Sequence, residues 1–112
     1  MGSDLFESST AARETFQEAD DSLGFSLSRV IFDGPAADLQ NTVNSQPAIM
    51  TVSIAALRAW QECQGSTAIK AKAVAGHSLG EYTSLVAADV IEFSHAVRLV
   101  RLGFDLMIVV YV

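Results

Sequence analysis

Cysteine is nearly absent from this sequence, because Cys63 is the only one among 112 residues. A single cysteine cannot close an internal disulfide, so nothing points to a secreted domain that depends on disulfides. Histidine is almost as rare, and the spacing of Cys63, His77 and His95 fits no zinc-site pattern. We therefore expect no metal and no cofactor.

Positive charge is also scarce, since seven basic residues face thirteen acidic ones and the net charge is −6. Without a basic surplus to displace counterions from phosphates, nucleic-acid binding is not expected. Glycine and proline are few, and half of the residues are hydrophobic, which excludes fibrous and disordered classes. A chain of this length has room for one domain.

Long hydrophobic runs are missing as well. The longest uncharged apolar run, residues 106–112, is much shorter than the roughly 20 residues that a membrane-spanning helix needs. Residues 1–7 contain no basic residue and no apolar run, so they do not resemble a signal peptide. These absences predict a protein of the cytoplasm without membrane contact.

Helical periodicity dominates what is present. Ser9 and Thr10 can cap a first helix, and Gly24 suits its left-handed end. Pro47 is expected as the first residue of a helix that is apolar on most faces and therefore buried, with Phe16 and Trp60 as core anchors. The predicted helices cover about residues 10–22, 25–32, 47–60 and 79–90, and a last one that begins near Ser94.

Residues 71–75 (AKAVA) are predicted to form a strand, and a second strand is expected at the C-terminal end. The predicted fold class is therefore α/β, similar to the α/β-hydrolase type, mostly helical with one or two parallel strands. A parallel sheet needs several strands to satisfy its backbone groups. One or two strands are too few for such a sheet, which predicts that part of the domain is missing.

One motif carries chemistry: residues 76–80 (GHSLG) fit G-x-S-x-G. A random chain of this length contains such a match about once in thirty cases, but the flanking strand-like and helix-like runs are typical of a nucleophile elbow. The elbow predicts a strained or positive φ at Ser78, an oxyanion-binding N–H at Leu79, and a need for glycine at positions 76 and 80. The alternative is a glycine-rich helix start with Ser78 as its cap.

The motif is part of a longer resemblance. Residues 76–82 (GHSLGEY), 42–48 (TVNSQPA) and 33–39 (DGPAADL) resemble, in order and spacing, segments of malonyl-CoA:acyl carrier protein transacylases and polyketide-synthase acyltransferase domains. The resemblance extends from about Met1 to Arg101.

The resemblance implies an [acyl-carrier-protein] S-malonyltransferase of fatty-acid or polyketide synthesis, with malonyl-CoA and acyl carrier protein as partners. Ser78 would form the acyl-enzyme, the Leu79 N–H would bind the oxyanion, and Gln46 would be a substrate-binding residue near the nucleophile.

The sequence departs from the family pattern in three places. The family's first strand with its G-Q-G loop, and its base histidine with the ferredoxin-like subdomain, have no match here. Residues 1–112 are thus expected to be an incomplete large subdomain, and an inactive fragment. The arginine that pairs with the malonyl carboxylate in the family falls on Leu102 or Gly103, and Arg101 is expected to point elsewhere. Neither His77 nor His95 is expected to be the base.

Two other functions stay open. A serine hydrolase of the α/β-hydrolase type shares the elbow, but it needs an acidic residue and then a histidine after the serine, and only residues 79–112 follow Ser78. A non-catalytic binding or interaction module is the other alternative.

Overall fold

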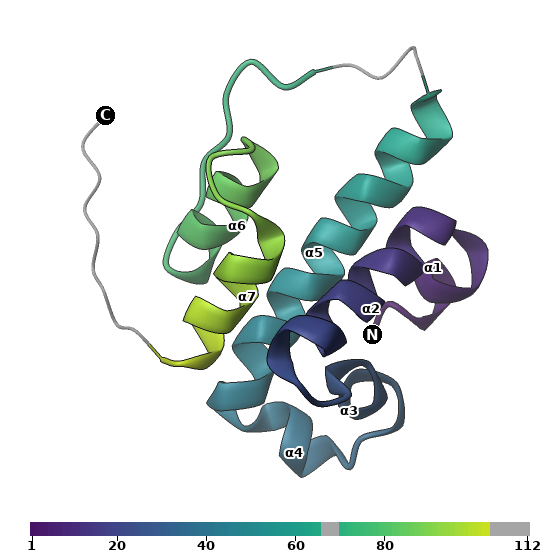
Figure 1. Ribbon diagram of the computed structural model, residues 1–112, viewed down its shortest axis with the longest axis vertical. Helices are drawn as coiled ribbons and strands as arrows, with labels where there is room; N and C mark the ends of the chain where they lie inside the picture. The colour runs from purple at the N-terminus through teal and green to yellow at the C-terminus, as the bar shows by residue number, and fades with distance from the viewer. Residues whose placement is uncertain (66–69, 104–112) are drawn as a thin grey trace.

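A computed structural model describes residues 1–65 and 70–103, and this part of the chain is an arrangement of α-helices around one long central helix (Figure 1). The α6 and α7 helices lie together beside α5, and α3 and α4 lie near its N-terminal end. The helices are α1 (Ser3–Ser8), α2 (Thr10–Leu23), α3 (Leu27–Asp33), α4 (Ala36–Gln40), α5 (Thr42–Gln64), α6 (Leu79–Ala87) and α7 (Phe93–Arg101).

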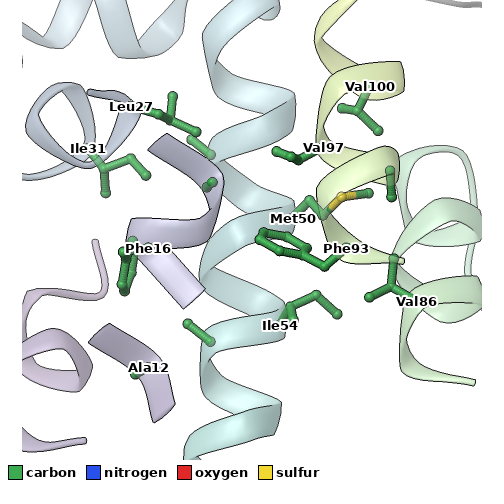
Figure 2. Packing of buried hydrophobic residues seen from close by; sticks show 14 residues of the cluster. Ala12, Phe16, Leu27, Ile31, Met50, Ile54, Val86, Phe93, Val97 and Val100 are labelled. Carbon is green, nitrogen blue, oxygen red and sulfur yellow. The ribbon is translucent and has the colours of Figure 1, made fainter. Parts of the chain in front are cut away.

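The core forms where α2, α5 and α7 meet (Figure 2). Phe16 of α2, Met50 and Ile54 of α5, and Phe93 and Val97 of α7 are all buried there. Burial of each such side chain contributes about 1.5–3 kcal/mol, and this contact holds the bundle together.

The α2 helix has the termini that the sequence predicts. The Ser9 hydroxyl accepts a hydrogen bond from the Ala12 N–H at 3.1 Å, and Gly24 ends the helix at a φ of +74°. The cap satisfies one of the N–H groups that lack a partner inside the helix. Phe16 is fully buried, as expected.

The α5 helix begins earlier than predicted. It starts at Thr42, where the Asn41 side chain accepts a hydrogen bond from the Val43 N–H, so Pro47 lies inside the helix and not at its first position. The prediction for Trp60 is also wrong, because this side chain is 44% exposed. Ile49 is exposed to a similar extent, so this helix is not buried on all faces.

The predicted strand at residues 71–75 is wrong for this structure. The residues form no strand; all are exposed, and their backbone makes no hydrogen bond with any other part of the chain that the structure describes. A strand needs a neighbour to pair with its N–H and C=O groups, and residues 1–65 and 77–103 supply none. The predicted C-terminal strand lies outside the described residues.

None of the described helices is long and apolar enough to cross a bilayer.

Glu62, near the end of α5, connects this helix to the start of α2. Its Oε2 atom accepts hydrogen bonds from the Ser9 hydroxyl at 2.6 Å and from the Ala11 N–H at 3.2 Å. Both bonds favour the charged carboxylate, the Ser9 bond most, and they lower the pKa of Glu62 below its ordinary value of 4.5.

This arrangement predicts a pH dependence of stability. A carboxyl group whose pKa is lowered by folding stabilises the protein above its unfolded-state pKa, and this contribution is lost as the pH falls through the folded-state value. We expect Glu62→Gln to unfold at lower urea concentration than the wild type at neutral pH, and the difference to shrink as the pH falls below 4.5. Glu14→Gln, at an exposed position of α2, is the control. A difference for Glu62→Gln that stays constant with pH would contradict the assignment.

Candidate active site

The turn that carries Ser78 has the geometry that the sequence predicts. Ser78 has a φ of +56° and a ψ of −118°, its side chain is exposed, and α6 begins at the next residue. A positive φ at a residue other than glycine costs about 1–3 kcal/mol, and such strain is concentrated at functional sites. The serine hydroxyl is thus presented to solvent at the N-terminus of a helix.

The two glycines of the motif differ in what they do. A Cβ atom on Gly76 would lie 1.9 Å from the Gly80 carbonyl oxygen and 2.1 Å from its carbonyl carbon, so the turn requires glycine at position 76. A Cβ atom on Gly80 would meet no other atom within 4 Å. The expectation of a steric need at both positions is therefore wrong for Gly80, because only the Gly76 side of the turn is closed by backbone.

Backbone N–H groups of the turn have different partners. The Gly80 N–H donates to the His77 carbonyl at 2.9 Å, and the Glu81 N–H donates to the Ser78 carbonyl at 3.0 Å. The Leu79 N–H donates to no other group within residues 1–65 and 70–103. It lies at the positive end of the α6 dipole, where a donor can stabilise a developing oxyanion.

Neither histidine forms a hydrogen bond with Ser78 in the described part of the chain. His77 is exposed. His95, on α7, has a side chain that is 59% exposed, and its Nδ1 atom lies 3.7 Å from Glu92 Oε2. A serine hydroxyl without a base stays protonated and weakly nucleophilic.

Gln46 and Arg101 line one small pocket, of about 150 Å³, together with residues of α6 and α7. Tyr82, which lies one helical turn after Ser78, also lines it. The expectation that Arg101 points elsewhere than the family's carboxylate-binding arginine stays a prediction. The helical rotation on which it was based does not extend past Arg101, because α7 ends there and Gly103 has a φ of +66°.

The guanidinium of Arg101 is held by three contacts. It stacks over the Phe25 ring at 4.3 Å from the centroid, donates to the Val43 carbonyl at 3.4 Å, and donates to Asn44 Oδ1. Leu102, one of the two positions aligned with the family's carboxylate-binding arginine, is 70% exposed. The sequence signal that could have revealed Arg101 is Pro47, which deprives the Val43 carbonyl of its helical donor.

Residues 1–65 and 70–103 contain no group of three or more His, Cys, Asp or Glu side chains that could hold a metal ion.

The sequence is similar to known proteins over most of its length. The sequence profile of the acyl transferase domain matches residues 1–110. The malonyl CoA-acyl carrier protein transacylase of Bacillus subtilis strain 168 is 46% identical over 101 residues, which are 90% of this chain and 31% of that protein. The protein of the same name from Escherichia coli K12 is 47% identical over 103 residues, 91% of this chain and 32% of that protein.

Solved structures of malonyltransferases are similar to this chain in fold. The acyl carrier protein S-malonyltransferase of Vibrio cholerae has a TM-score of 0.84 at 42% identity, over 92% of this chain and 33% of that one. A malonyl-transacylase in complex with its type II polyketide-synthase acyl carrier protein has a TM-score of 0.80 at 44% identity, over 91% of this chain and 32% of that one. The chain thus spans about a third of the length of the relatives it matches.

Proposed function

Because the chain belongs to the acyl transferase domain family, we propose that it carries the nucleophile for malonyl transfer from coenzyme A to an acyl carrier protein in fatty-acid or polyketide synthesis. The observation that carries this proposal is the exposed Ser78 at the strained turn before α6. The names of the relatives, which are malonyl transacylases, support the choice of malonyl-CoA and acyl carrier protein as partners. We also propose a cytoplasmic location.

In the first half-reaction, Ser78 Oγ attacks the thioester carbonyl carbon of malonyl-CoA and loses its proton to a base. The carbonyl oxygen becomes an oxyanion, to which the Leu79 N–H donates a hydrogen bond. The carbon–sulfur bond then breaks, coenzyme A leaves as its thiol, and malonyl-Ser78 remains. In the second half-reaction, the phosphopantetheine thiol of the carrier protein attacks this ester and regenerates the Ser78 hydroxyl.

We propose that residues 1–112 correspond to part of the large subdomain of this family. The base then comes from the family's histidine and the second oxyanion donor from its G-Q-G loop, neither of which this sequence matches. Ser78 supplies the nucleophile, the Leu79 N–H at the start of α6 supplies one oxyanion donor, and Gln46 supplies a substrate contact. The pocket shared by Gln46 and Tyr82, one turn from Ser78 along α6, supports this role for Gln46.

The test is acylation of the purified chain by malonyl-CoA and by acetyl-CoA, followed by peptide mapping with mass spectrometry. We expect a slow mass gain of one acyl group on the peptide that contains Ser78. Ser78→Ala should lose it, whereas Ser94→Ala, a matched change on α7, should keep it. Arg101 is occupied by Phe25, Val43 and Asn44, so we expect no strong preference for malonyl over acetyl. An adduct that persists in Ser78→Ala would overturn the proposal.

A further inference from the structure

The first two turns of α5 contain an interruption. Pro47 lies inside this helix and has no N–H, so the Val43 carbonyl, four residues earlier, lacks its helical hydrogen-bond donor. The proline ring also crowds that carbonyl and tilts it away from the helix axis. A carbonyl in this position needs a donor from outside the helix.

Arg101 supplies that donor from another helix. Its Nη1 atom donates to the Val43 carbonyl at 3.4 Å, which is long for such a bond, and to the Asn44 side-chain oxygen beside it. The Asn44 side chain is itself oriented, because its Nδ2 donates to the Asp38 carbonyl at 2.8 Å. The Phe25 ring covers the guanidinium at 4.3 Å. Contacts with α5 and with the loop between α2 and α3 therefore restrict this guanidinium.

We infer that Arg101 is a positioning residue, which replaces the donor that Pro47 removes and so fixes the turn of α5 that carries Gln46. Gln46 immediately precedes Pro47 and lines the same pocket as Arg101 and Tyr82. One part of the inference rests on the proposed function: that the positioned Gln46 serves to contact the acyl substrate. The link between Arg101 and Pro47 rests on geometry alone.

Arg98 provides a natural comparison. It lies in the same last turn of α7 as Arg101, but its side chain is exposed. A general benefit of positive charge at the C-terminal end of α7 would apply to both arginines. A benefit that depends on Pro47 would apply to Arg101 alone.

A double-mutant cycle tests this dependence. We expect Arg101→Met to raise the unfolding equilibrium constant about tenfold when Pro47 is present. In a Pro47→Ala background, where residue 47 donates to the Val43 carbonyl, we expect the effect to shrink by at least about threefold. Arg98→Met should show no such coupling. An equal cost of Arg101→Met in both backgrounds would overturn the inference.

A spectroscopic measurement separates positioning from simple stabilisation. The NMR signals of the Gln46 side-chain amide should shift and lose order in Arg101→Met, and they should be restored when Pro47→Ala is added. Arg101→Lys, which keeps a cationic donor, should keep most of the wild-type signal. Arg101→Gln, which removes the charge, takes the place of Arg101→Met if that variant fails to fold. Unchanged Gln46 signals in Arg101→Met would count against positioning. Absent acylation of Ser78 in the wild type would instead refute the proposed function and leave this result standing.

Discussion

Replacing Gly76 with alanine is expected to destabilise the chain by about 1–3 kcal/mol and to lower the rate of covalent labelling of Ser78 by a reactive serine probe about 100-fold. The new Cβ atom would lie 1.9 Å from the Gly80 carbonyl oxygen, which belongs to the backbone and cannot rotate away. The turn must open to relieve this contact. Opening it moves Ser78 away from the N-terminus of α6.

Gly80→Ala is the matched control, because it adds the same methyl group to the same motif. Its Cβ atom would meet nothing within 4 Å, and Gly80 lies within α6. Alanine is the better helix former by about 0.5–1 kcal/mol, so this variant should be at least as stable as the wild type. Urea unfolding of both variants gives the comparison. Equal destabilisation at the two positions would show that the turn is not closed as described.

Malonyl transfer to a carrier protein by the purified chain is expected to be at least about 100-fold slower than transfer by the Bacillus subtilis relative. A general base contributes about 100-fold to 10,000-fold, and no histidine forms a hydrogen bond with Ser78 in the part of the chain that the structure describes. The measurement is initial transfer rate under identical substrate concentrations for the two proteins.

Comparable rates would show that a base operates within these 112 residues. His95→Ala and His77→Ala would then identify it, since they are the two histidines of the sequence. A loss of rate in only one of them would assign the role. Retention of the rate in both would require a carboxylate or a lysine as base.

Helix ends that are marked by a capping residue or a glycine could be predicted from the sequence. The ends of α2 follow from Ser9 and Gly24, whose side-chain oxygen and left-handed conformation act within a few residues of themselves. The turn at Ser78 was predictable for the same reason, because Gly76 and the start of α6 lie next to it in sequence. Signals of this kind do not depend on distant parts of the fold.

The start of α5 could not be predicted from the position of its proline. Proline is favoured at the first helical position, and this preference pointed to Pro47. The Asn41 cap and the donor from Arg101 allow the helix to begin at Thr42 instead. That donor comes from a residue more than fifty positions away, so no local pattern contains it.

Exposure of Trp60 and the missing strand at residues 71–75 have one cause. Both predictions were based on local composition, and both require neighbours that the described residues do not provide. Trp60 and residues 71–74 line one hollow of about 690 Å³, so they share the same surroundings.

The exposed segment around residues 71–75 has a consequence for self-association. Its unpaired backbone groups form the kind of edge on which copies of a chain can stack into aggregates. Lys70 and Lys72 are both exposed on it. In-register stacking of identical copies would bring each lysine against its own counterpart, and like charges directly opposite one another disfavour pairing. The two lysines therefore disfavour in-register stacking of identical copies, whereas pairing with a strand of different sequence would not meet this repulsion.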